Sequence, residues 1–200
     1  MNNNNSSKQI LLSVLGVAIL VVAVVGISFA AFSYSKTGTV ANTITTGTIT
    51  MSYSEPTNGI NLTNALPITD TAGKALKGDN NTFDFSVSAT VSGATTINYA
   101  VTAVKGDGCT VADSGVKVYL TDQADASIIA PTKVSALTKT GVNDASGAPA
   151  DQFVLKTGTY TKSATDTYRL RMWIADDYAA PSTSQKYVLK VNVYGKANAQ

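Results

Sequence analysis

Short runs in which apolar and polar residues alternate are the feature of this chain that most restricts its fold. In residues 83–91 (FDFSVSATV) the odd positions are Phe, Phe, Val, Ala and Val, and the even positions are Asp, Ser, Ser and Thr. A period of two puts one set of side chains on the core face of a β-strand and the other set in water. Residues 97–103 (INYAVTA) repeat the pattern after Ser92 and Gly93, so the two runs are predicted to form a hairpin.

The same alternation predicts further strands, each bounded by turn-forming residues. These strands are expected at residues 48–53, 116–120, 153–156, 168–174 and 187–194. No stretch after residue 35 has the apolar period of a helix, and residues 55–81 and 122–151 are predicted to be rich in loops. About seven or eight strands in one domain, residues 48–200, predict an all-β, two-sheet sandwich. It is either a jelly roll, which we favour, or an immunoglobulin-like Greek key.

Residues 1–30 form a hydrophobic leader. Lys8 precedes an apolar run over residues 10–27, and the next charged residue is Lys36. The small residue Ala30 lies where a signal peptidase recognises its substrate, so cleavage there would make Ala31 the new N-terminus. The run is longer than the apolar part of a usual signal peptide, about 7–15 residues, and approaches the roughly 20 that span a bilayer. The sandwich is therefore predicted to follow a hydrophobic helix that is either a cleaved signal peptide or a membrane anchor.

The chain lacks the residue types that most catalytic and metal sites need. It has no histidine and one cysteine, Cys109, which excludes Ser-His-Asp triads, histidine and cysteine zinc sites, and disulfides within the chain. Glycine motifs for phosphate binding are missing, and a formal net charge of +2 without a basic stripe argues against nucleic acid as a partner. We therefore predict a protein that is not an enzyme and uses no cofactor or metal. The lack of disulfides in an exported chain fits a bacterial surface.

Arg169, Arg171 and Trp173 share one face of the strand that they are predicted to form. A strip of cationic and aromatic side chains can bind a glycan or a neighbouring protein. On that hypothesis the chain is a membrane-anchored surface module that binds a ligand. The other interpretations are a cross-strand ladder with Lys190 and Asn192 of the last strand, or a face that a loop covers.

Two segments near the end of the leader carry a resemblance to a known family. The first reads Ser-Phe-Ala-Ala-Phe-Ser over residues 28–33, and the second reads Asn-Thr-Ile-Thr-Thr-Gly-Thr-Ile over residues 42–49. Together they resemble the TasA/camelysin (CalY) family of secreted Gram-positive proteins. Members have an Ala-Phe start to the mature chain and an Asn-x-Phe-x-x-Gly-Thr-Leu-like segment after it. Ile44 stands where Phe is common in the family, and Ile49 stands where Leu is common.

The resemblance implies a secreted jelly-roll subunit of a biofilm-matrix or cell-surface fibre, released by a signal peptidase and polymerised with copies of itself. Accessory matrix proteins are further expected partners. Contact with the membrane is expected only through the leader. Family fibres are held by an N-terminal segment that adds as a strand to the next subunit. Residues 31–47 are the candidate donor here, because this segment lacks proline and carries Phe32, Tyr34, Val40 and Ile44 to fill a groove. A head-to-tail contact that does not close gives filaments.

Overall fold

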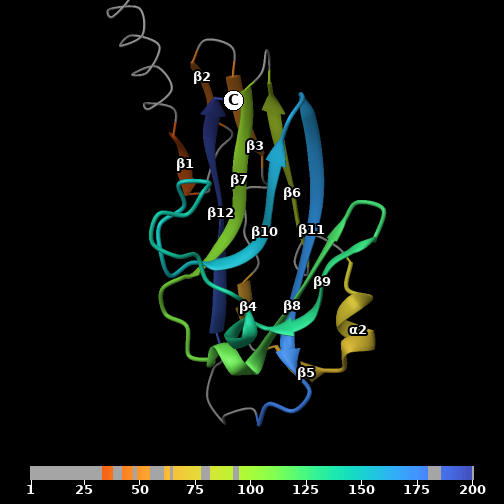
Figure 1. The fold of residues 1–200 in the computed structure, drawn as a ribbon. Coiled ribbons are helices and arrows are strands. Elements are labelled where there is room, and N and C mark those ends of the chain that lie inside the picture. The colour runs from red at the N-terminus through yellow and green to blue at the C-terminus, as the bar shows by residue number, and fades with distance from the viewer. Residues whose placement is uncertain are drawn as a thin grey trace, which may run out of the picture.

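Two β-sheets face each other across a shared hydrophobic core (Figure 1). The computed structural model describes residues 33–37, 42–46, 49–54, 61–63, 65–77, 82–91, 95–179 and 186–199 of the chain. The predicted leader, residues 1–30, lies outside them. No helix among the described residues has the length and apolar character needed to cross a bilayer. The all-β, two-sheet architecture agrees with the prediction from the alternating sequence.

The five-stranded sheet has the order β1-β12-β7-β10, and β4 pairs with residues 186–188 at the start of β12, before residues 192–196, which pair with β1. Its strands are β1 (Ser33–Thr37), β4 (Asn61–Thr63), β7 (Thr95–Lys105), β10 (Phe153–Tyr160) and β12 (Lys186–Ala199). The seven-stranded sheet has the order β2-β3-β6-β11-β8-β9, and β5 adds to β11 in parallel. Its strands are β2 (Asn42–Thr46), β3 (Ile49–Ser54), β5 (Pro67–Ile68), β6 (Thr82–Thr90), β8 (Val116–Asp122), β9 (Ser127–Lys133) and β11 (Ala164–Ala175). The described helical elements are α2 (Asp70–Lys74) and the 3-10 turns η1 (Asp113–Gly115) and η2 (Val134–Ala136).

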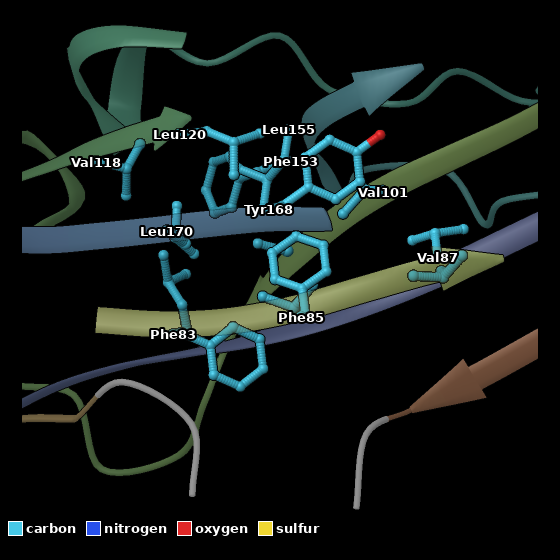
Figure 2. Close-up of a cluster of buried hydrophobic side chains, with 14 of the residues drawn as sticks. Phe83, Phe85, Val87, Val101, Val118, Leu120, Phe153, Leu155, Tyr168 and Leu170 are labelled. Carbon is cyan, nitrogen blue, oxygen red and sulfur yellow. The ribbon is translucent and has the colours of Figure 1, made fainter. Parts of the chain in front are cut away.

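Side-chain alternation in β6 shows how the sequence builds the core. Phe83, Phe85 and Val87 are each at most 4% exposed, whereas the residues between them are half-buried. The Phe85 ring packs against the ring of Tyr168 in β11, with their centroids 5.2 Å apart (Figure 2). The neighbouring strand β11 therefore continues the apolar face of β6, and both cover the same core.

The predicted hairpin between residues 83–91 and 97–103 is wrong. The first run forms β6, which pairs with β3 and β11, and the second forms β7, which pairs with β12 and β10 in the other sheet. Each run has one apolar face, and these faces meet the same core from opposite sides. Alternation identifies the buried face of a strand but does not say which sheet the strand joins.

Other predicted strands are found, but several extend beyond their predicted ends. β11 begins at Ala164, before the predicted start at residue 168. β12 continues to Ala199, past Gly195, although the strand was predicted to end at residue 194. β9 lies inside the segment 122–151 that was predicted to be loops. It carries Pro131, which an edge strand tolerates because the proline's missing N–H can face away from the sheet.

Candidate assembly site

The N-terminal strand β1 occupies the outer edge of the five-stranded sheet (Figure 1). It pairs antiparallel with β12, the last strand, from Ser33 opposite Lys196 to Thr37 opposite Asn192. On its other side β12 pairs with β7, so β12 is the strand that joins β1 to its sheet in the described part of the chain. Without β1, this stretch of β12 would present unpaired backbone N–H and C=O groups, which accept an added strand. We therefore take this edge as the candidate assembly site.

A residue from the opposite sheet closes the inner face of β12 at this edge. Met51 of β3 is fully buried and lies against Gly195 of β12, where an added Cβ atom would overlap the Met51 sulfur. Gly195 is the residue opposite Tyr34 of β1, and it is also opposite Tyr99 of β7. A glycine inside a strand commonly marks such a close approach. The missing side chain lets the two sheets come together next to the edge strand.

Replacing Gly195 with alanine is expected to lower the free energy of unfolding by about 1–3 kcal/mol, because the new methyl group overpacks the space that Met51 fills. Gly141→Ala is the matched control, since no atom lies within 4 Å of a Cβ built at Gly141. Urea denaturation followed by the fluorescence of Trp173, the single tryptophan, measures both variants. Equal stabilities would show that Met51 does not occupy the space above Gly195.

The loop between β9 and β10 covers the outer face of β12 near the same edge. Asn192 and Tyr194 are 1% and 5% exposed. Gln152 of this loop accepts a hydrogen bond from the Thr102 hydroxyl at 2.5 Å and donates one to the Tyr194 hydroxyl at 3.0 Å. Among the described residues, Asn192 Oδ1 has no hydrogen-bond partner. The loop and its hydrogen bonds therefore bury this face of β12.

The predicted donor segment is not one strand. Tyr34 lies in β1 of the five-stranded sheet, whereas Ile44 lies in β2 of the seven-stranded sheet. Four further predicted residues lie outside the described part of the chain: Ala30, Ala31, Phe32 and Val40. The segment 31–47 therefore contributes one strand to each sheet.

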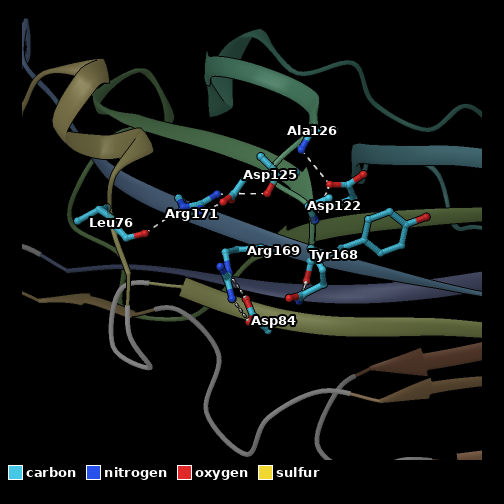
Figure 3. Close-up of polar contacts among 11 residues, drawn as sticks. Leu76, Asp84, Asp122, Asp125, Ala126, Tyr168, Arg169 and Arg171 are labelled. Atoms are coloured by element: carbon cyan, nitrogen blue, oxygen red, sulfur yellow. Dashed lines mark hydrogen bonds and ion pairs between the residues drawn. The ribbon is translucent and has the colours of Figure 1, made fainter.

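The strip of Arg169, Arg171 and Trp173 is not an open surface, which corrects the hypothesis of an exposed binding patch. Arg171 and Trp173 are each 2% exposed. Arg171 is bonded between Leu76, after α2, and Asp125 in the turn that follows β8 (Figure 3). Gly73 of α2 lies on the Trp173 indole. The strand pairs with β6 and β8 rather than β12, so the alternative ladder with the last strand does not form either. The remaining interpretation was a face that a loop covers. This face is indeed covered, by α2 with Leu76 and by the turn that follows β8.

Arg169 and Arg171 are held in different ways. Arg169 donates two hydrogen bonds to the Asp84 carboxylate, at 2.8 Å and 2.7 Å. These bonds hold the pKa of the Asp84 carboxyl below its usual value. The buried Arg171 guanidinium donates to three oxygens, which belong to Leu76 at 3.0 Å, Thr121 at 3.2 Å and Asp125 at 2.7 Å. Both arginines therefore form hydrogen bonds within the protein that hold neighbouring segments on this face of the sheet.

A second polar cluster joins the two sheets. Asp166 Oδ2 of β11 accepts hydrogen bonds from Tyr160 at 2.7 Å, Tyr168 at 3.3 Å and Tyr99 at 3.4 Å. Burial, above all, raises the pKa of the three phenols, so they remain protonated donors. The cluster borders a pocket of about 450 Å³ whose other lining residues are Asp122, Ile128, Lys156, Thr165 and Thr167. The sequence did not indicate this pocket, because its residues come from five strands far apart in the chain.

Neither the described residues nor known proteins assign a catalytic or metal function to the chain. Within the described part, no three His, Cys, Asp or Glu side chains are grouped so that they could hold a metal ion. No protein-family model, curated protein or solved structure matches the chain. Among the described residues, the open strand edge at β12 is the feature that suggests a function.

Proposed function

We propose that this chain is a secreted structural subunit of an extracellular fibre, in which the N-terminal segment joins each copy to the next. The observation that carries the proposal is the position of β1. The first described strand pairs with the last strand at an open side of the sheet. β1 of another copy can make the same ladder with β12, so exchange between copies loses no pairing. Such an exchange of identical elements is a low-cost route to assembly.

The resemblance to the TasA/camelysin family supports the same proposal. On this view, a signal peptidase of a Gram-positive bacterium cleaves after Ala30 and frees the segment that begins at Ala31. The protein then works outside the cell as a structural component and not as an enzyme. Its partners are copies of itself, with accessory matrix proteins as further candidates. Because each copy gives one strand and receives one, the contact is head-to-tail and extends into a filament.

The proposed sandwich is a jelly roll. Its support is the strand order, in which β4-β12-β7-β10 forms one sheet and β6-β11-β8-β9 forms the other. From β4 onward, the chain passes between these two sets of four strands as in two Greek keys folded together. On this assignment β1 extends the same edge of β12 that β4 pairs with, and β2 and β3 are additions beside β6.

Deletion of residues 33–37 from the chain expressed with its leader in a Gram-positive host tests the proposal. We expect fibres of the parent chain in electron micrographs of the cell surface and medium, and none from the deletion variant. Trp173 fluorescence checks that the variant is folded, and a synthetic peptide of residues 31–41 should bind its open β12 edge where a scrambled peptide does not. Fibres of normal length from a folded deletion variant would contradict strand donation.

A second candidate function is ligand binding by a membrane-anchored surface module. The pocket beside Asp166 favours it, because Lys156 contributes a cation there and has no ion pair among the described residues. In that case the exported protein keeps its leader, and a glycan or other polar ligand shifts the NMR signals of the pocket. Intact mass of the exported chain separates the two candidates, since a start at Ala31 supports the fibre subunit.

A further inference from the structure

A bulge in β10 turns a lysine toward the space between the two sheets. Val154 and Lys156 are opposite successive residues of β7, so Leu155 between them is an extra residue in the ladder. Lys156 is opposite Val101, which is fully buried in the core. Opposed residues of antiparallel strands project to the same face of their sheet, and a bulge commonly re-aims a side chain in this way. The half-buried Lys156 side chain therefore projects inward, where a regular strand would point it away.

Lys156 shares its pocket with two carboxylates. Asp122 and Asp166 line the same cavity of about 450 Å³, which is within the range of small-molecule sites. Lys156 forms no ion pair in the described part of the chain, so its ammonium lies more than 4.0 Å from both carboxylates. Opposite charges that line one pocket without touching leave room for a ligand between them.

Each carboxylate is held by one of its oxygens. Asp166 Oδ2 accepts the hydrogen bonds of the three tyrosine hydroxyls, and Asp122 Oδ1 accepts from the backbone N–H groups of Ala124 at 2.9 Å and Ala126 at 2.8 Å. Among the described residues, neither Asp166 Oδ1 nor Asp122 Oδ2 has a hydrogen-bond partner. One oxygen thus fixes each side chain, and the other is ready to accept from a ligand without first being ordered.

We infer that this pocket binds a small zwitterion, with its ammonium on Asp122 and Asp166 and its carboxylate on Lys156. The charges select this class. A diamine would meet the Lys156 ammonium, a dianion would meet two carboxylates, and a neutral sugar would leave all three charges without a counter-charge. Ile128 of β9 gives an apolar contact for the carbon atoms between the two ends of the ligand.

The inference rests on the second candidate function, ligand binding, and gives its ligand class. It does not depend on the fibre, because none of the lining residues of the pocket comes from β1 or β12.

Four ligands with the same four-carbon length test the charge argument: 4-aminobutyrate, 1,4-diaminobutane, succinate and 1,4-butanediol. Their binding to the full chain in detergent micelles is measured by ligand-observed NMR titration. We expect 4-aminobutyrate to bind at least about tenfold more tightly than the other three, because a hydrogen bond to a charged group contributes about that factor or more. Among zwitterions, tighter binding of alanine than of trialanine identifies a free amino acid as the ligand, and the opposite order identifies a short peptide.

Two lysine variants test the role of the bulge residue. Lys156→Glu should reverse the preference, so that 1,4-diaminobutane binds more tightly than 4-aminobutyrate. Lys190→Met is the matched control, since Lys190 of β12 is exposed and lies outside the pocket, and it should bind as the parent does. Trp173 fluorescence shows that both variants are folded, and their fibres are scored separately by electron microscopy.

The remaining outcomes separate the inference from the function on which it rests. Tightest binding of succinate, the diol or the diamine by the parent would overturn the zwitterion and keep ligand binding. An unchanged preference in a folded Lys156→Glu chain would also overturn the inference, because Lys156 would then not contact the ligand. Failure of every probe to bind would overturn both the inference and the second candidate function, and would leave the fibre proposal unaffected.

Discussion

Replacing Trp173 with alanine is expected to lower the free energy of unfolding by about 3–5 kcal/mol, the range for loss of a large buried aromatic side chain. The indole is 2% exposed and forms the surface on which Gly73 of α2 lies. The variant therefore leaves a cavity in the interior and also removes the side chain against which α2 packs. Chemical denaturation followed by circular dichroism measures the change, because the variant has no tryptophan to report it.

Trp173→Phe should cost much less. Among the described residues the indole Nε1 has no hydrogen-bond partner, so phenylalanine removes an unsatisfied buried donor while it keeps an aromatic ring under α2. Leu66→Ala is the control, since Leu66 is 78% exposed and its truncation should change stability by no more than about 0.5 kcal/mol. If Trp173→Ala were as mild as Leu66→Ala, α2 would not be packed on the indole.

Arg171→Met is expected to destabilise the protein by about 1–3 kcal/mol, although methionine fills much of the space of the arginine stem. The change leaves the buried hydroxyl of Thr121 and the carbonyl of Leu76 without the donor that each has in the parent chain. Asp125 loses its ion pair at little cost, because its side chain is largely exposed and can be hydrated. Thermal and urea denaturation measure the difference.

Arg169→Met is the matched comparison for Arg171→Met. Arg169 lies on the same face of the same strand as Arg171, and its substitution also breaks an arginine–aspartate ion pair. Arg169 and Asp84, however, are both partly exposed. A pair in contact with water contributes about 0–1 kcal/mol. A larger effect at Arg169 than at Arg171 would contradict the view that burial, and not charge alone, makes Arg171 important.

The sequence predicts a strand's buried face well when only one of its faces is apolar. β6 is the clear case, because its phenylalanines alternate with polar residues and all point to the core. β11 is harder to predict, because Met172, Trp173 and Ile174 are consecutive and all buried. Its second face is covered by α2, which comes about a hundred residues earlier in the chain. No local pattern records that long-range contact.

The sequence indicated which segment takes part in the candidate assembly site, but not how the strands of that segment pair. Lack of proline and an apolar content marked residues 31–47 as an extended segment. Whether its two halves join one sheet or two depends on which edges are open, and those edges are set by β12 and β3. Gly195 gave a usable local signal, since a glycine within an alternating run indicates a close approach, but the residue that approaches, Met51, is distant in sequence.

The antiparallel pairing of β1 with β12 has a mechanical consequence for a fibre built in this way. The hydrogen bonds of an antiparallel ladder are perpendicular to the strands. Tension transmitted along β1 from one subunit to the next therefore loads the whole ladder in shear, instead of opening its bonds one at a time from an end. A short strand can then resist pulling much better than its small number of bonds suggests, and the fibre would tolerate stretching along its length better than peeling from its side.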